Sequence, residues 1–272
     1  MCDTCGCNVT DANRHLVEEG GKHAHTHDGQ VAVEVLENLL SENDHQAAHN
    51  REHFDQHGVL AINLMSSPGS GKTSLLEATI DALGQKYRIG VIEGDLETEN
   101  DAERIRRKGV SAVQITTGTA CHLDAHMVHQ ALHRIELDPL DILFIENVGN
   151  LVCPASFDLG QHLNVTLLSV TEGDDKPAKY PVIFRAADKV LITKTDLLPL
   201  LDDFDPERAL QALRNLALSE PVTTLSARSK AGLQEWLHWV EHQVARQAQR
   251  RAASDNSAPA LDPHHTHAHA HG

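Results

Sequence analysis

Aromatic residues are scarce in this chain, with Phe, Tyr and Trp making up only 3% of its 272 residues. Long apolar runs are missing too, and no stretch approaches the ~20 residues that a membrane-spanning helix needs. The first residues lack the basic start and apolar run of an export signal. We therefore expect a soluble, cytoplasmic protein that does not associate with membranes.

Basic residues are also few: the chain has 23 Lys and Arg but 39 Asp and Glu, which gives a formal net charge of −16. Nucleic-acid binding needs clustered Lys and Arg against the phosphates, so no nucleic-acid partner is expected. The hydrophobic fraction of 40% supports a sizeable core. The length allows one α/β domain of about 200 residues with tails, the alternative being two small domains.

Histidine, by contrast, is abundant: the chain has 20, unevenly spread. Eight precede the first predicted strand, seven lie in the body, and five close the chain in "HHTHAHAHG". We interpret the ends as metal-binding low-complexity tails that are disordered without metal. An affinity tag is the alternative for the last tract, but interleaved Thr and Ala favour native sequence.

Three of the five cysteines, Cys2, Cys5 and Cys7, lie in the opening "MCDTCGCNVT". An odd number of thiols without an export signal argues against a disulfide framework. Residues 1–30 are therefore predicted to form a disordered Cys- and His-rich arm that binds metal.

The rest of the chain alternates between helical and strand-like patterns. Residues 31–57 predict an N-terminal helix, and an apolar run from residue 58 leads into a Gly- and Ser-rich loop. Six further strand-like segments follow, with helices predicted near residues 73–83, 99–108, 122–137, 207–218 and 232–251. Such alternation indicates a three-layer α/β fold over residues 58–252, with a mostly parallel sheet and helices on both faces. Residues 253–272 are interpreted as a linker and the His-rich tail.

The stretch "SSPGSGKTS" falls between the first predicted strand and the next helix, where a phosphate-binding loop belongs. Its glycines let backbone N–H groups face a polyphosphate, Lys72 would reach the outer phosphates, and Thr73 would bind Mg²⁺. Ser66 stands where the general pattern has glycine. The predicted phosphate contacts are Gly69, Ser70, Gly71, Lys72, Thr73 and Ser74.

Two later loops indicate that the nucleotide is GTP or GDP. In "ITKTD", Thr193, Lys194 and Asp196 match the N/T-K-x-D arrangement that reads guanine, with Thr in place of the usual Asn. The Asp196 carboxylate accepts two hydrogen bonds that guanine supplies and adenine does not. Ser226 and Ala227 in "LSARSKAG" would contact the guanine oxygen through the backbone.

The residues of hydrolysis are expected at two strand ends. "EGD" offers Glu93 and Asp95, and "DILFIENVG" ends its strand with Glu146. We favour Asp95, with Thr73, for Mg²⁺, and name Lys72, Asp95 and Glu146 as the catalytic set. A helix-capping role is the alternative for each carboxylate. No glutamine or arginine finger is evident, so slow turnover is expected.

The remaining cysteines lie beside this machinery. Cys121 and His122 in "GTACHLDAH" and Cys153 in "ENVGNLVCP" follow predicted strands at the edge where α/β folds bind ligands. Together they fit a zinc or nickel site, although a single cysteine is more often a small buried residue.

Two histidine stripes at helical spacing complete the candidates. His45, His49, His53 and His57 share one face of the upstream helix, and His122, His126, His129 and His133 share a face of a later one. An i, i+4 pair can chelate a metal, but we interpret His126, His129 and His133 as a solvated face.

These motifs together resemble the HypB family of hydrogenase nickel-incorporation GTPases. The match comprises the N-terminal thiols, "SSPGSGKT", "EGD", "GTACHLD", "ENVGNLVCP", "VTEGDDKPAKYP", "TKTDLLP" and the closing "SA" loop. It covers the start of the chain and essentially all of residues 58–245.

The resemblance implies a P-loop GTPase that dimerises with GTP or metal and delivers nickel to the large subunit of nickel–iron hydrogenase. It also implies a small zinc- and nickel-binding partner similar to HypA. Cys2, Cys5 and Cys7 match the family's high-affinity nickel site, whose fourth square-planar ligand would be the α-amine of Met1 or Cys2. Cys121, His122 and Cys153 match the metal site of its GTPase domain. Two alternatives remain, a nickel-storage protein with incidental GTPase activity and an accessory GTPase for another nickel enzyme such as urease.

Overall fold

The computed structural model describes residues 29–95, 99–216, 218 and 220–257. The arm that carries Cys2, Cys5 and Cys7 and the histidine-rich tail both lie outside the described residues. The predictions made for these two segments therefore remain predictions.

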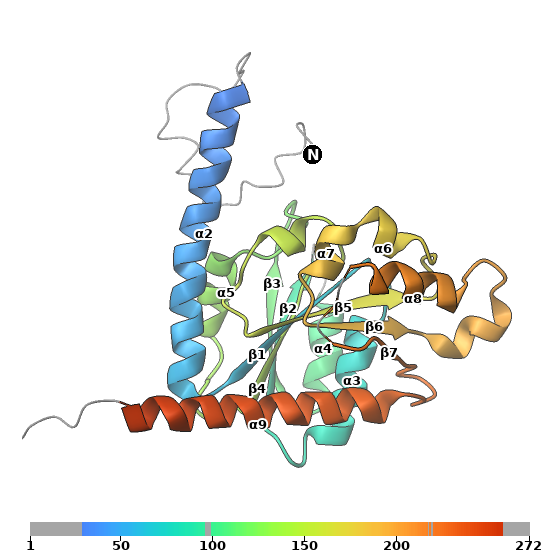
Figure 1. The fold of residues 1–272 in the computed structure, drawn as a ribbon. Coiled ribbons are helices and arrows are strands. Elements are labelled where there is room, and N and C mark those ends of the chain that lie inside the picture. The colour runs from blue at the N-terminus through green and yellow to red at the C-terminus, as the bar shows by residue number, and fades with distance from the viewer. Residues whose placement is uncertain (1–28, 96–98, 217, 219, 258–272) are drawn as a thin grey trace, which may run out of the picture.

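A seven-stranded parallel sheet forms the centre of the molecule, in the order β3-β2-β4-β1-β5-β6-β7 (Figure 1). Its strands are β1 (Leu60–Ser66), β2 (Ile89–Asp95), β3 (Ser111–Thr116), β4 (Ile142–Glu146), β5 (Leu163–Ser169), β6 (Lys189–Thr193) and β7 (Thr223–Thr224). Around them lie the helices α2 (Gly29–His57), α3 (Lys72–Leu83), α4 (Asn100–Arg106), α5 (Ala125–Leu132), α6 (Lys176–Lys179), α7 (Pro181–Arg185), α8 (Pro206–Arg214) and α9 (Leu233–Ser257). Two short 3₁₀ helices are η1 (Cys153–Ser156) and η2 (Thr195–Leu200). The predicted three-layer parallel α/β fold is confirmed.

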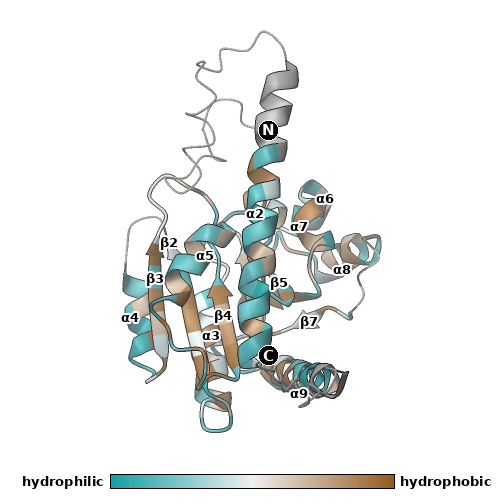
Figure 2. Cartoon of the chain, turned by 90° about the vertical axis from the view of Figure 1, so that its left-hand side faces the viewer, coloured by the Kyte–Doolittle hydropathy of each residue, from teal (hydrophilic) through white to brown (hydrophobic). Residues whose placement is uncertain are grey.

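Buried strands explain why the sheet needs helices on both faces. All seven residues of β1 are buried, and alternate side chains point to opposite layers. Leu60, Ile62 and Leu64 pack with α3 and α9, whereas Ala61 packs with α2 and α5. In Figure 2 the central strands such as β4 are largely hydrophobic, while the helices around them carry many hydrophilic residues. The carboxyl ends of these strands position the sites described below.

Several predicted helices have different limits in the structure, and α8, predicted to residue 218, ends at Arg214. The helix predicted over residues 122–137 is only α5, because the Asp124 side chain caps its start by accepting a hydrogen bond from Met127 N at 2.8 Å. This leaves His122 in the preceding loop. At the other end of the chain, α9 continues to Ser257, beyond the predicted start of the linker at residue 253. Of the helices in the described residues, none is both long and apolar enough to cross a membrane.

Candidate functional site

The loop between β1 and α3 leads into the first turn of α3, whose backbone N–H groups have no partner within the helix. Gly71 caps α3 in the left-handed conformation, at φ 93°, which a residue with a side chain rarely adopts. A cavity of about 380 Å³ opens over this loop. It is lined by the loop and by the ends of β2 and β4, namely Pro68 to Ser74, Glu93 to Asp95, Asp101, Arg104, Glu146 to Gly149 and Lys194. Backbone N–H groups at a helix start beside a lysine form a phosphate-binding arrangement.

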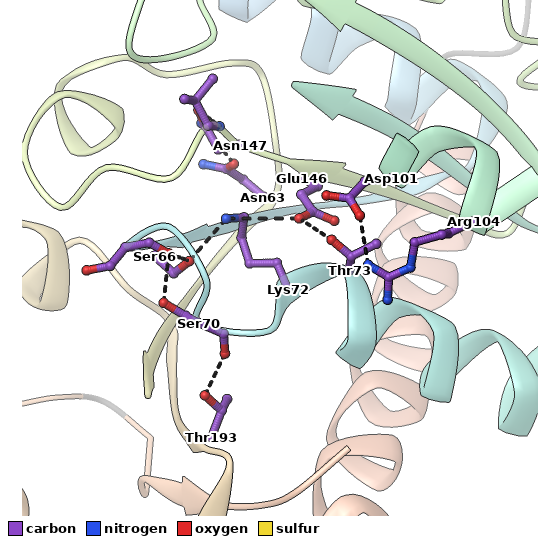
Figure 3. Close-up of polar contacts among 12 residues, drawn as sticks. Asn63, Ser66, Ser70, Lys72, Thr73, Asp101, Arg104, Glu146, Asn147 and Thr193 are labelled. Atoms are coloured by element: carbon purple, nitrogen blue, oxygen red, sulfur yellow. Dashed lines mark hydrogen bonds and ion pairs between the residues drawn. The ribbon is translucent and has the colours of Figure 1, made fainter. Parts of the chain in front are cut away.

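Lys72 is held at the floor of this cavity by two side chains (Figure 3). Its Nζ donates to Ser66 Oγ at 3.1 Å and lies 4.0 Å from Glu146 Oε1. Ser66 Oγ in turn donates to the carbonyl of Ser67 at 2.7 Å. The serine that departs from the glycine pattern therefore has a structural role, since its hydroxyl positions the lysine.

Three carboxylates meet on the other side of Lys72. Oxygen atoms of Glu93, Asp101 and Glu146 lie within 4.8 Å of one another, and Thr73 Oγ1 donates to Glu146 Oε1 at 3.0 Å. Burial raises the pKa of Glu93, and the neighbouring Glu146 carboxyl raises it further. Burial also raises the pKa of Glu146, while the positive charge of Lys72 opposes that rise. Like charges this close are stable only with protons or a cation between them.

The unpaired oxygens of this acidic cluster fit a divalent cation. Within the described part of the chain, the buried Oε2 atoms of Glu93 and Glu146 have no hydrogen-bond partner. Carboxylate and hydroxyl oxygens are the ligands that Mg²⁺ prefers. Glu93, Glu146 and Thr73 would therefore hold Mg²⁺ next to the phosphate loop.

The sequence favours Asp95, with Thr73, as the Mg²⁺ ligand, but the clustered carboxylates are other residues. Asp95 lies at the end of β2 and lines the same cavity, but it is not one of the three clustered carboxylates. Sequence reasoning missed Asp101, which α4 supplies, and Arg104, which lines the cavity and donates to Asp101 Oδ1 at 2.8 Å. Their i, i+3 spacing on one short helix after "EGD" was the available signal. A second guanidinium nitrogen of Arg104 pairs with Glu77 at 2.7 Å, so the arginine is fixed beside the cavity.

The loop after β4 lies directly against the phosphate loop. A Cβ atom on Gly149 would lie 2.7 Å from the Cα of Pro68, which is closer than real Cβ contacts allow. Asn150 N donates to the carbonyl of Ser66 at 2.7 Å. The phosphate loop and the loop after β4 are therefore in direct contact.

The predicted base-reading loops lie beside one another at the ends of β6 and β7. Thr195 N donates to the carbonyl of Leu225 at 3.3 Å, which ties the "TKTD" segment to the residue before Ser226. Lys194 takes a left-handed conformation, at φ 59°, and its Nζ donates to Gly69 O at 2.5 Å. Asp196, Ser226 and Ala227 are near in the fold but do not line the phosphate cavity.

Two more side chains support the phosphate loop from the sheet. Thr193 Oγ1 donates to the carbonyl of Ser70 at 2.8 Å, which gives a role to the threonine that replaces the usual asparagine. Ser70 Oγ donates to Glu172 Oε1 at 2.5 Å, and Ser169 N donates to the same oxygen at 3.1 Å. Sequence reasoning did not identify Glu172, although it lies in the quoted "VTEGDD" motif.

The structure brings Cys121, His122 and Cys153 together, as predicted for a metal site. Their ligand atoms lie within 4.8 Å of one another, with the two sulfurs 3.2 Å apart and Cys121 Sγ 3.9 Å from His122 Nδ1. The His122 ring stacks on Phe157, with 4.0 Å between centroids. Burial lowers the pKa of His122 to about 4, so the imidazole is neutral at pH 7. Its buried Nε2 has no hydrogen-bond partner among the described residues. A neutral imidazole and two thiols are a ligand set for zinc or nickel.

The comparison with known proteins decides the family. Residues 60–222 match the family model described as the CobW/HypB/UreG nucleotide-binding domain. The hydrogenase maturation factor HypB of Azotobacter vinelandii is 54% identical over 211 residues, which cover 78% of this chain and 69% of that protein. The chain belongs to the HypB family of hydrogenase maturation factors. The HypB of Escherichia coli strain K12 is 48% identical, with 83% of this chain and 77% of that protein covered.

Two solved HypB structures share the fold of this HypB-family chain. The crystal structure of HypB from Helicobacter pylori in complex with nickel matches with a TM-score of 0.72 and 42% identity, covering 75% of this chain and 96% of that one. HypB from Archaeoglobus fulgidus matches with a TM-score of 0.71 and 39% identity, covering 75% of this chain and 99% of that one. The predicted resemblance is thereby confirmed.

Proposed function

We propose that this HypB-family chain is a GTP-hydrolysing nickel metallochaperone that delivers nickel to the large subunit of nickel–iron hydrogenase. One observation carries the proposal: a single residue, Asn150, contacts both candidate sites. Its backbone N–H donates to Ser66 O beside the phosphate loop, and its side chain donates to Cys121 O beside the thiols. Nucleotide state and metal affinity are then linked through one loop.

GTP hydrolysis depends on positively charged and N–H groups that are already in position around the phosphates before the reaction begins. The backbone N–H groups of the loop and the ammonium of Lys72 stabilise charge on the outer phosphates. A bound Mg²⁺ would supply positive charge that offsets the negative charge of the phosphates. Thr73, Glu146 and Glu93 would hold the ion, and Asp95 lines the same cavity. Arg104 faces the same cavity as a further cation.

Guanine is the base that the later loops favour. The Asp196 carboxylate accepts hydrogen bonds from N1–H and the exocyclic amine, and an adenine leaves it unpaired. The backbone at Ser226 and Ala227 contacts the guanine oxygen. The hydrogen bond between Thr195 and Leu225 supports this assignment, because it holds the two base-reading loops side by side.

Metal capture and transfer are divided between two sites. Cys2, Cys5 and Cys7 would capture nickel on the arm, and Cys121, His122 and Cys153 would hold nickel or zinc beside the nucleotide. In support of nickel as the cargo, the HypB of Helicobacter pylori has been crystallised in complex with nickel. The proposed assembly is a cytoplasmic homodimer promoted by GTP or metal, with a HypA-like metallochaperone and the hydrogenase large subunit as partners.

Two alternative functions are also consistent with the sequence. One is nickel storage with incidental GTPase activity, which the histidine content favours. The other is service to a second nickel enzyme, because the relative from Helicobacter hepaticus, 44% identical, is named a hydrogenase/urease maturation factor.

The deciding experiment measures hydrogenase activation in cells at limiting nickel. We expect Lys72→Ala to abolish activation, because the phosphate charge loses its cation, while a chain lacking residues 23–27 and 264–271 retains most of it. Lys86→Ala is the matched control, since Lys86 pairs with Glu241 outside the phosphate cavity. Activation that survives Lys72→Ala but fails in the shortened chain would support storage instead. Urease activation in the same cells tests the second alternative.

A further inference from the structure

Four histidines from two helices gather beside a second cavity, which shares no lining residue with the phosphate cavity. α2 runs beside α5, as the two views of the fold show (Figures 1 and 2). His49 and His53 lie one turn apart on α2, and His129 and His133 lie one turn apart at α5. His129 is the central member, because its ring contacts those of the other three.

Three of the ring separations lie in the range found for ligands of one cation, but no three of these histidines bring their ligand nitrogens within 4.8 Å of one another, so the side chains must rotate to share a cation. The ring centroids are 4.7 Å apart for His49 and His53, 5.2 Å for His49 and His129, and 4.8 Å for His129 and His133. With a metal–nitrogen bond of about 2.0–2.1 Å, imidazoles on one cation have centroids roughly 4.5–5.2 Å apart at ligand angles between 90° and tetrahedral. The His53–His129 separation of 6.1 Å needs a small side-chain rotation. His49 and His133 are exposed, and His49 Nδ1 lies 3.4 Å from Gln46 Nε2, a contact that a metal would have to replace.

The central histidine also has an unused ligand atom. Across the described residues, the buried Nδ1 of His129 has no hydrogen-bond partner. A cavity of about 420 Å³ lies next to the group and is lined by His53, His57, His129 and His133 among others. A buried nitrogen without a partner costs free energy that a cation would recover.

The protonation state of two of the four histidines favours metal over protons. Burial, and then the neighbouring histidines, lower the pKa of His53 and His129. Glu52 acts in the opposite direction on the pKa of His53, and the carboxylate of Asp138 is already paired with His57 Nδ1 at 2.5 Å. Glu136 also borders the cavity. Neutral imidazole is the form that binds a metal, so little proton release is needed near pH 7.

We propose a further metal site, between α2 and α5, whose ligands are the imidazoles of His49, His53, His129 and His133. Its occupant is a divalent first-row transition metal that prefers imidazole, nickel(II) or zinc(II). Of the three histidines interpreted as a solvated face, His126 and His133 are exposed, whereas His129 is partly buried with its Nδ1 covered. The site does not depend on the proposed GTPase function.

Such a site connects α2 to the body of the protein. The α2 helix follows the arm of residues 1–28, and α5 starts three residues after His122. A cation shared by the two helices would add a link between α2 and the domain that carries the second thiol site.

Metal-linked stability tests the site in the full-length chain. The ligands come from positions about 80 residues apart, so the site exists only when the chain is folded. The terminal thiols and histidine tracts bind metal in folded and unfolded chains alike, and such binding does not stabilise the fold. The parent protein for the test carries Cys121→Ser and Cys153→Ser, which removes the thiol site of the body. Urea unfolding is followed with and without free nickel, and again with zinc.

We expect the metal to raise the folded-to-unfolded ratio of the parent about 100-fold when free metal is 100 times Kd. His129→Gln should remove this gain, and His126→Gln, an exposed histidine of the same helix, should keep it. The double variant His49→Gln/His133→Gln changes only exposed side chains and should also remove it, which decides the matter if His129→Gln fails to fold. Equal gains in the His126→Gln and ligand variants, or no gain in the parent, would overturn the proposal. Comparing the gain with nickel and the gain with zinc tells which cation the site binds.

Discussion

The side chain of Asn150 donates a hydrogen bond to the backbone carbonyl of Cys121, with Nδ2 and O 3.3 Å apart. The same residue donates its backbone N–H to Ser66 O at 2.7 Å, and its Oδ1 accepts from Val152 N at 2.7 Å. One asparagine thus orders the turn that leads to Cys153 while it contacts both the phosphate loop and the loop of Cys121. A metal bound at ~2.0–2.3 Å by these thiols tolerates little displacement, so the contact is a route for coupling.

Replacing this side chain should uncouple the two sites. In a protein whose Cys2, Cys5 and Cys7 are serine, we expect nickel and zinc affinity to differ about 5-fold or more between GDP and a non-hydrolysable GTP analogue. Asn150→Ala should bring that ratio toward one, because the link to Cys121 is lost. Metal titration in the two nucleotide states measures the ratio. The control is Asn215→Ala, whose side chain accepts a hydrogen bond from Gln211 on the far helix α8.

Linkage supplies an internal check on this prediction. Nucleotide affinity must change on metal binding by the same factor as metal affinity changes with nucleotide. An unchanged ratio in Asn150→Ala would show that the coupling travels by another path. Equal affinities in both nucleotide states of the parent would show that there is none.

The Asp196→Asn exchange should change the base that the protein prefers. An amide reverses the hydrogen-bond polarity facing guanine N1–H, so GTP affinity should fall by about 10²-fold or more and xanthosine triphosphate should gain. Competition binding with both nucleotides measures the shift. Asp202→Asn, a nearby aspartate beyond η2, serves as the control. If the preference between the two nucleotides does not move, the guanine assignment to Asp196 is wrong.

The contact of Gly149 with Pro68 predicts a steric effect on turnover. In Gly149→Ala the new Cβ would lie 2.7 Å from backbone atoms of Pro68, so one loop must shift. A displacement of about 1 Å can cost on the order of 10²-fold in rate, and we expect GTP hydrolysis to fall by at least tenfold. Gly109→Ala controls for lost stability, because its positive φ strains the backbone in open space. Normal turnover in Gly149→Ala would mean that this packing does not matter for the reaction.

Buried His162 predicts a loss of stability in acid. Its Nδ1 accepts from Ala61 N at 2.9 Å, and burial lowers its pKa below 6.5 despite the hydrogen bond to Asp55. Below pH 6.5 the unfolded chain therefore takes up a proton that the folded chain does not, so the free energy of unfolding falls as pH falls toward the folded-state pKa. The slope is at most about 1.4 kcal/mol per pH unit for this group.

Urea unfolding between about pH 5 and 8 measures this slope. His162→Gln should flatten the slope in the acid part of that range by up to that amount, because the glutamine oxygen still accepts from Ala61 N but does not titrate. His126→Gln, an exposed histidine, should leave it unchanged. A slope in His162→Gln equal to that of the unsubstituted protein would assign the acid sensitivity to other buried histidines, such as His122, whose pKa is also lowered.

Local sequence was enough to determine the fold class and the phosphate loop. Alternating apolar and helical patterns give a parallel α/β sheet, and "GSGKT" between strand and helix has one structural use, because only glycine takes the left-handed turn at Gly71 at low cost. The grouping of Cys121, His122 and Cys153 was also predictable, since the ends of parallel strands meet at one edge.

Long-range packing decided the rest. The sequence placed Asp95 at the end of β2 but did not show that Asp101 of α4 joins Glu93 and Glu146, because side-chain separations across a cavity depend on how a helix docks. Likewise, the sequence of each helix by itself, α2 or α5, indicates only a stripe of histidines on the helix surface. Only the docking of α2 on α5 turns them toward one another and buries His129 Nδ1, because contacts between positions about 80 residues apart have no periodic signal in the sequence.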